Sequence, residues 1–229
     1  MPTAVFVDAG FFLKRFPIVY GRRDAKDPEV VARKLHEMAL DHLTQRGNVE
    51  RRDLYRIFVY DCPPLLKKAE MAISKTAIDF STTDTAKFRL RFHEELKCLR
   101  KVALRLGRLQ DGRGWRLNAG SLQALLKGQR NFASLTDQDF VYDIRQKGTD
   151  MRIGLDIASV AYKRQADQMV LISGDADFVP AAKLARREGV DFILDPMWNP
   201  ISSDLHEHVD GLRSTSPKPI PIARVARVP

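Results

Sequence analysis

The stretch VLISGDADFVPAAKLARREG, which runs from Val170 to Gly189, places two aspartates directly after an apolar run. Asp175 and Asp177 fall where a buried strand is expected to end and a helix to begin. Like charges this close raise each other's pKa and oppose folding unless a positive group lies between them. A divalent cation is one such group. An Asx turn followed by a helix N-cap would explain Asp177, but it hardly explains both carboxylates.

Two further aspartates have positions from which they can join this pair. Asp8 ends the apolar stretch TAVFVD, and Asp150 falls in the first turn of the helix expected before the 170–173 strand. The carboxyl ends of parallel strands meet at one edge of a sheet, so Asp8 and the pair are expected there together. Simpler roles stay open, because Asp8 can cap a turn and Asp150 can complement a helix dipole. Asp156 lies about 120° around the same helix from Asp150 and is a weaker candidate.

Converging carboxylates without cysteine or histidine partners favour a hard cation with oxygen ligands, Mg²⁺ or Mn²⁺. Such an ion can lower the pKa of a bound water for attack on a phosphodiester and offset charge on the phosphorus oxygens. The five histidines lack ligand spacing and are interpreted as surface or structural residues. The sequence does not choose between one ion and two.

The elements that must position these acids alternate between strand and helix. Continuous apolar runs predict strands at TAVFVD, DLYRIFVYDCPP, QMVLIS and VDFILDP. Helical spacing predicts helices after Asp27, from Asp150 with Thr149 as N-cap, over DFVPAAKLARR and over SSDLHEHVDGLR, with Gly47 and Gly189 as stops. This alternation predicts an α/β protein, a three-layer α/β/α sandwich around a mostly parallel, Rossmann-like sheet.

The middle of the chain is less regular. Residues from about 64 to 101 have helical character, and Asp111-Gly112 between two short apolar runs indicates a hairpin. Within 119–140 only LQALL is expected to be helical. We therefore predict one domain over residues 1–213 with an inserted basic helical and hairpin region at about 64–140. A flexible, proline-rich basic tail is expected over 214–229.

The positive charge of the chain is concentrated in one segment. Residues 85–130 hold twelve basic and three acidic residues, an excess of nine that equals the formal net charge of +9. A basic block on an otherwise neutral chain is typical of a polyanion-binding face. The alternative is a solvated helix surface. If the block binds RNA, its candidate contacts include Arg89, Arg91, Arg105 and Arg108.

Composition limits the class of protein. No apolar run approaches the roughly 20 residues that span a bilayer, so no membrane partner is expected. The N-terminal MPTAVFVDAG carries an acid in its apolar stretch and is not expected to be a secretory signal. Two cysteines without metal spacing are interpreted as reduced thiols in a cytoplasmic protein. Whether the chain forms a homodimer stays open.

Four motifs in order, VFVDAG, FVYDCPP, QKGTDMRIGLDIA and LISGDADFVPAAKLARREG, resemble the NYN domain in its LabA-like (DUF88) branch, a relative of the PIN nucleases. The resemblance implies a PIN-like fold whose carboxylates hold Mg²⁺ or Mn²⁺ and cleave RNA. Matched by motif, the catalytic and metal-binding acids are Asp8, Asp150, Asp175 and Asp177. Lys147 would contact a phosphate of the RNA. Many members of the family have Asn three positions after the first aspartate, where this chain has Phe11.

The residues also allow two alternatives to a ribonuclease to be compared. A haloacid-dehalogenase-like phosphatase needs a second carboxylate two residues after its nucleophile, where this chain has Gly10. A PIN-like protein that binds RNA without cutting it is the stronger alternative, because Phe11 and the basic block both suit it. The RNA sequence, and whether DNA is also a substrate, stay open.

Overall fold

The computed structural model describes residues 2–44 and 51–219, and its centre is a six-stranded sheet. The strands lie in the order β10-β9-β8-β1-β2-β5, and every pairing between them is parallel. Their bounds are β1 Thr3–Asp8, β2 Leu54–Asp61, β5 Val102–Leu106, β8 Gln168–Ile172, β9 Asp191–Asp195 and β10 Gly211–Leu212. All four strands that the apolar runs predict are therefore present in this sheet.

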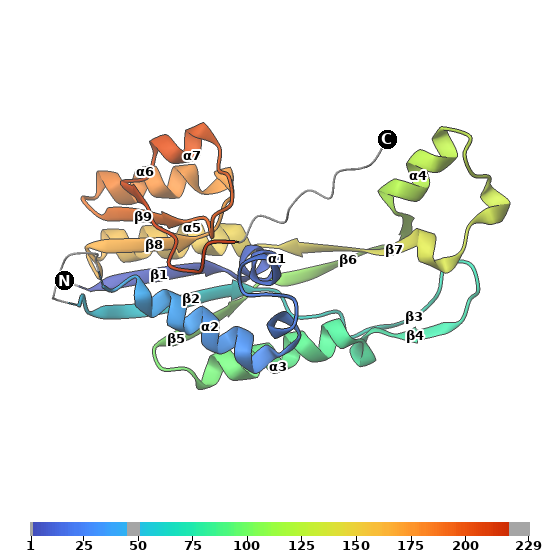
Figure 1. Cartoon of the computed structure of the whole chain (residues 1–229), viewed down its shortest axis with the longest axis horizontal. Helices are drawn as coiled ribbons and strands as arrows, with labels where there is room; N and C mark the ends of the chain where they lie inside the picture. The colour runs from blue at the N-terminus through green and yellow to red at the C-terminus, as the bar shows by residue number, and fades with distance from the viewer. Residues whose placement is uncertain (1, 45–50, 220–229) are drawn as a thin grey trace.

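Helices cover both faces of the sheet (Figure 1). Their bounds are α1 Ala9–Val19, α2 Pro28–Asp41, α3 Asp84–Cys98, α5 Thr149–Tyr162, α6 Val179–Arg187 and α7 Ser203–Glu207. One hydrophobic cluster joins the sheet to α1, α2 and α3, and a second joins it to α5, α6 and α7. The predicted three-layer α/β/α sandwich is confirmed.

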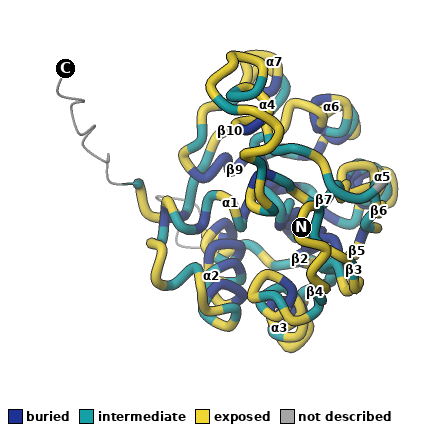
Figure 2. Tube along the Cα trace, turned by 90° about the vertical axis from the view of Figure 1, so that its right-hand side faces the viewer, coloured by how far each residue is buried: buried dark blue, intermediate teal, exposed yellow. Residues whose placement is uncertain are grey.

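The alternation of side chains along β1 shows how the layers form. Val5 and Val7 pack toward α1 and α2, whereas Ala4 and Phe6 pack toward α5 and α6. Successive side chains of a strand point to opposite faces, so a strand covered on both sides must be apolar throughout. In Figure 2 the dark-blue buried segments lie between the helices that surround them.

Capping residues fix two of the helix ends as the sequence predicts. Asp27 accepts hydrogen bonds from the backbone N–H groups of Glu29 and Val30 at the start of α2, and Pro28 is its first residue. Gly189 has a φ of 82° just after α6, a conformation that glycine adopts without strain. The predicted stop at Gly47 lies outside the described residues.

An antiparallel ribbon extends away from the sheet, with α4 at its far end (Figure 1). It consists of β6 Arg108–Leu117 and β7 Phe140–Lys147, joined through α4 Ala119–Leu126, and the short hairpin of β3 Lys68–Glu70 and β4 Ala77–Asp79 runs beside it. The short helix predicted at LQALL is confirmed by α4.

The hairpin predicted around Asp111-Gly112 is wrong. β5 pairs with β2 in the central sheet, β6 pairs with β7, and Asp111-Gly112 marks an irregularity within β6. A Cβ on Gly112 would lie 2.2 Å from the carbonyl oxygen of Asp143. The glycine therefore permits close approach of two strands and does not form a turn.

The predicted insertion at about 64–140 contains α3 and β5, which pack in the central unit. The first part of the predicted tail is also bound to the core, since the Thr215 hydroxyl donates to the Met38 carbonyl at 3.0 Å. Trp198 Nε1 donates to the Ser216 carbonyl at 2.9 Å. Residues 220–229 lie outside the described part, and the domain boundaries stay a prediction.

Candidate active site

The carboxyl ends of β1 and β8 open into a cavity of about 360 Å³, here named the acidic cavity. Three of the four predicted aspartates line it, Asp8 from β1, Asp150 from α5 and Asp175 from the turn after β8. Its other lining residues are Gly10, Phe11, Lys14, Gln146, Thr149, Ser173, Gly174, Ala176 and Asn199. The fold thus brings together acids that are more than 140 residues apart in the chain.

Asp8 is held at the junction of β1 and α1. Its Oδ1 accepts a hydrogen bond from the Phe11 N–H at 3.1 Å as the N-cap of α1, and the Ser173 hydroxyl donates to its Oδ2 at 3.5 Å. Burial raises the pKa of the Asp8 carboxyl, and the charge of Asp150 raises it further. The Phe11 hydrogen bond and the charge of Lys14 oppose this rise in pKa without cancelling it. Asp8 therefore caps α1, and its carboxylate also faces the acidic cavity.

Asp150 lies in the first turn of α5, but the cap of that helix differs from the prediction. Gly148, with φ 80°, is the N-cap, and Thr149 is the first helical residue. The Thr149 hydroxyl instead contacts the Cys62 sulfur at 3.5 Å. Loss of hydration raises the pKa of the Asp150 carboxyl, and the charges of Asp175 and Asp177 raise it further.

Asp175 and Asp177 divide between two positions. Asp175 lines the acidic cavity and its Oδ1 accepts from the Asp177 N–H at 3.0 Å, which caps the short 3-10 helix Ala176–Phe178. Asp177 is exposed and does not line the cavity. Its charge still reaches Asp150, as the raised pKa of that carboxyl indicates.

The donor chemistry of the acidic cavity fits a hard divalent cation. Asp150 and its neighbours Asp8 and Asp175 repel each other, and no histidine or cysteine of the described residues lines the cavity. Mg²⁺ needs only one or two protein carboxylates besides water. Over the described ranges 2–44 and 51–219, no three acidic, histidine or cysteine side chains form a ready-made metal-binding group. The acids share a cavity but are not already arranged as a coordination shell.

Lys14, Gln146 and Asn199 line the acidic cavity but were not predicted from the sequence. Phe11, which the sequence did single out, packs its ring against Gly174, where a Cβ would lie 2.9 Å from Phe11 Cε2 and 3.4 Å from Asn199 Nδ2. Asn199 thus brings a side-chain amide to the cavity that Phe11 also lines. Lys14 and Gln146 arrive from α1 and β7. Of these three missed residues, Lys14 lies close to Asp8 in the chain and could have been found from the sequence.

Lys147 and Arg108, two of the predicted RNA contacts, lie side by side. They are paired residues of β7 and β6 at the end of the ribbon next to α5. A Cβ on the adjoining Gly107 would lie 2.9 Å from both the Lys147 carbonyl and the Thr149 hydroxyl, so this end of the ribbon touches the wall of the acidic cavity. Neither side chain lines the acidic cavity, and strand alternation places both on the face of the ribbon opposite to Leu109 and Gln146, so their contact with RNA stays a prediction.

The other predicted contacts have intramolecular partners. Arg89 pairs with the buried Asp61, which also accepts from His93 Nε2 at 2.8 Å. Burial alone would raise the pKa of Asp61, but the hydrogen bonds and the Arg89 charge outweigh it and lower that pKa. The other two arginines also form ion pairs, Arg91 with Glu95 at 2.5 Å and Arg105 with Asp156 at 3.4 Å.

Asp156, the weaker acidic candidate, lies outside the acidic cavity. It accepts a hydrogen bond from the Tyr60 hydroxyl at 2.7 Å, in addition to the Arg105 pairing. Its helix angle from Asp150 turns it toward β2 and β5, as the 120° offset suggested.

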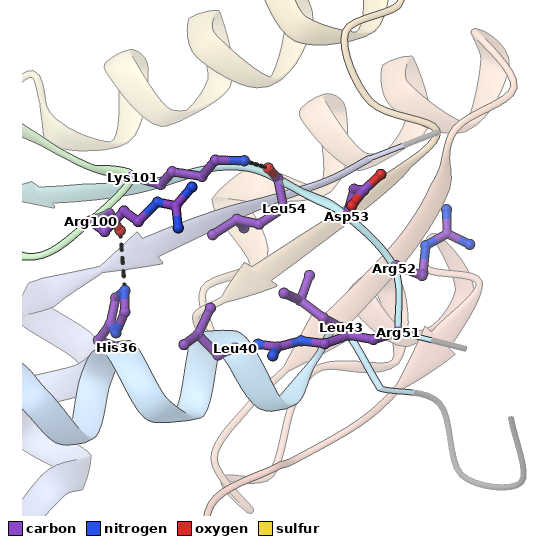
Figure 3. Close-up of a pocket in the computed structure, with 9 residues that line it drawn as sticks. All are labelled: His36, Leu40, Leu43, Arg51, Arg52, Asp53, Leu54, Arg100 and Lys101. Carbon is purple, nitrogen blue, oxygen red and sulfur yellow. Dashed lines mark hydrogen bonds between the residues drawn. The ribbon is translucent and has the colours of Figure 1, made fainter. Parts of the chain in front are cut away.

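Part of the basic block lies at the opposite edge of the sheet, where β2 and β5 begin. Arg100 and Lys101 line a cavity of about 410 Å³ there, here named the opposite-edge cavity, together with Arg51 and His36 (Figure 3). Lys101 donates to the Leu54 carbonyl, and His36 Nε2 contacts the Arg100 carbonyl at 3.1 Å. The block is therefore not one continuous face.

A parallel sheet between helical layers, with acids gathered at the carboxyl edge, defines a PIN-like α/β fold. The family model of the NYN domain matches residues 119–211 of the chain. NYN domains are PIN-like and are generally nucleases. The matched range contains Asp150, Asp175 and Asp177 and leaves Asp8 outside it. No curated protein matches the chain.

Within the described ranges, no helix is both long and apolar enough to cross a membrane.

Proposed function

We propose that this protein is a metal-dependent endoribonuclease that hydrolyses RNA phosphodiester bonds with Mg²⁺ or Mn²⁺ in the acidic cavity. One observation carries the proposal: Asp8, Asp150 and Asp175 line the same cavity at the carboxyl edge of the sheet. The raised pKa values of Asp8 and Asp150 support a site that gains stability from a cation. The NYN match over residues 119–211 supports RNA as the substrate.

Each side chain has a role in this proposal. Asp8, Asp150 and Asp175 would hold the ion directly, and Asp177 would add negative charge from the rim. Bound Mg²⁺ or Mn²⁺ would supply a water of lowered pKa and positive charge against the phosphorus oxygens. Lys14 lines the cavity and would orient the phosphate, whereas Lys147 would meet the RNA from the other face of the ribbon.

The second candidate function is RNA binding without cleavage. Phe11 favours RNA binding without cleavage, because its apolar ring lines the acidic cavity at a position where many NYN proteins have Asn. Asn199 weighs against it, since it brings an amide to the same cavity from the segment after β9.

One assay separates the two candidates. Purified protein is incubated with labelled single-stranded and structured RNA in Mg²⁺, Mn²⁺ or EDTA, beside Asp175→Asn and the control Asp204→Asn on α7. The nuclease proposal expects cleavage that needs metal and falls at least about 100-fold in Asp175→Asn only. Binding that all three proteins share, with no metal-dependent cleavage in any of them, would favour the binder.

We also propose membership of the LabA-like branch, on the motif order VFVDAG, KGTD and SGDADF. A cytoplasmic location is proposed because Cys62 and Cys98 are both free thiols.

A further inference from the structure

A third cavity, here named the ribbon cavity, lies between the β6–β7 ribbon and the start of α3. Its volume is about 390 Å³, within the roughly 300–1,000 Å³ range of small-ligand pockets. Its lining residues are Cys62, Pro63, Pro64, Leu65, Phe80, Thr83, Thr85, Ala86, Arg89, Leu109, Tyr142, Ile144 and Gln146. Arg89 and the two threonines are the main polar groups in an otherwise apolar wall.

The ribbon cavity adjoins the acidic cavity through one residue of β7. Gln146 lines both cavities. Tyr142, Ile144 and Gln146 are alternate residues of β7, so they share one face of the ribbon. That face forms a continuous track from the acids to the apolar hollow, with a single side chain between the two.

The walls have the chemistry that holds a flat aromatic ring. Phe80 and Tyr142 line the cavity with their ring centroids 5.0 Å apart, and Trp115, which is not among the lining residues, packs edge-on against Tyr142 at 5.2 Å. Ile144 points into the ribbon cavity and is still 43% exposed. Arg89, held by Asp61, presents a fixed cation at the same wall. Aromatic and apolar faces with a guanidinium are what proteins use to stack an unpaired base.

We propose that the ribbon cavity receives one unpaired nucleobase of the RNA, on the nucleotide next to the phosphate in the acidic cavity. This inference rests on the proposed function and adds a substrate class to it. A base reaches such a hollow only when it is unstacked and unpaired. The favoured substrate is therefore a single strand, loop or bulge, with cleavage beside the captured base.

The first test crosses a protein variant with a substrate variant. Ile144→Trp fills the ribbon cavity with an apolar ring, and an abasic ribonucleotide, placed in turn at each position around the cut, removes the base. We expect kcat/KM to fall about tenfold for either change alone, the scale of one base stacked on aromatic side chains. At the position where removal of the base lowers kcat/KM, the two changes together are expected to lower kcat/KM no more than either change alone.

Leu122→Trp on α4 is the matched control, because Leu122 is exposed and does not line the ribbon cavity. It should retain the full response to the abasic position. Equal abasic sensitivity in Ile144→Trp and the parent would overturn the inference, and so would equal cleavage of paired and unpaired versions of one site.

A binding test works even if no RNA is cleaved. In the Asp175→Asn background with EDTA, an oligoribonucleotide carrying 2-aminopurine should change its fluorescence on binding. Ile144→Trp should abolish that change, whereas Leu122→Trp should retain it. If the fluorescence changes in this way but the wild-type protein cleaves no RNA, the nuclease proposal is contradicted and the base site is supported. If the Asp175→Asn protein binds the RNA without a change in fluorescence, only the base site is contradicted.

Discussion

Asp8 has two roles, as the N-cap of α1 and as a carboxylate of the acidic cavity. Its Oδ1 caps α1 by accepting from the Phe11 N–H at 3.1 Å, and its carboxylate also faces Asp150 and Asp175 across the acidic cavity. An asparagine could keep the cap through its own carbonyl oxygen but would remove the charge. Capping and charge can therefore be separated by one substitution.

The raised pKa of Asp8 predicts how the free energy of unfolding depends on pH. Because the folded-state pKa of Asp8 is raised, its contribution to the free energy of unfolding is fully present below about pH 4 and is lost as pH rises through the folded-state value. Metal-free Asp8→Asn should therefore melt above the wild type at pH 7.5, by a margin that shrinks toward pH 4. Thermal denaturation in EDTA across this range measures it.

The same experiment with Mn²⁺ should reverse the order. A cation that binds only the folded state raises the melting temperature of the wild type and has little effect on Asp8→Asn. The Asp204→Asn control should follow the wild type in both conditions. Equal stabilisation of all three proteins by Mn²⁺ would mean that the ion binds elsewhere.

Arg89 offers a second residue-level prediction, because its partner Asp61 is wholly buried. Arg89→Ala leaves that carboxylate with His93 and the Cys62 N–H but without its guanidinium partner, and breaking such a buried pair costs about 3 kcal/mol. Arg91, on the same helix, is 63% exposed in its pair with Glu95, so Arg91→Ala should cost less than about 0.5 kcal/mol. Urea denaturation of both variants decides between a structural and a purely RNA-binding Arg89.

At the scale of elements, the start of α5 sets the position of Asp150. Gly148 has φ 80°, where a side chain is strained, whereas Gly154 lies within α5 with open space around its Cβ position. Gly148→Ala should lower the free energy of unfolding by about 1 kcal/mol and also lower cleavage. Gly154→Ala should raise stability by up to about 1 kcal/mol and leave cleavage unchanged. Chemical denaturation and RNA cleavage of both variants provide the comparison.

The central elements were predictable because each carries its own local signal. β1, β8 and β9 are short, apolar and bounded by polar residues, and Asp27 and Gly189 mark helix ends by their own chemistry. The ribbon lacked such a signal. Its strands pair across the whole α4 segment, so Arg108 meets Lys147, and the Asp-Gly dipeptide that suggested a turn serves a close strand crossing.

The candidate site divides in the same way. Asp8, Asp150 and Asp175 could be found because each follows or begins a recognisable element. Gln146 and Asn199 could not, since only the pairing of β7 and the course of the chain after β9 bring them to the cavity. Arg89 and Arg105 looked like free cations in the sequence, but Asp61 and Asp156 take them as partners.

At the scale of the whole molecule, the charge of +9 is distributed in separate groups. Arg108 and Lys147 lie at the base of the ribbon beside the acidic cavity, Arg130 is paired with Asp139 beyond α4, and Arg51 and Arg100 line the opposite-edge cavity. A net positive charge attracts RNA from any direction, but only cations near the acids can hold a phosphate there.

This distribution predicts that the position of a charge matters more than its number. In the Asp175→Asn background without metal, Arg108→Gln with Lys147→Gln removes two charges beside the acidic cavity. The slope of log affinity for single-stranded RNA against log salt should become shallower by about 1.4, since each phosphate contact contributes about 0.7. Arg51→Gln with Arg100→Gln removes the same net charge at the opposite edge and should change the slope little. If both pairs reduce the slope equally, RNA responds to the overall charge, and the base of the ribbon does not position its phosphates.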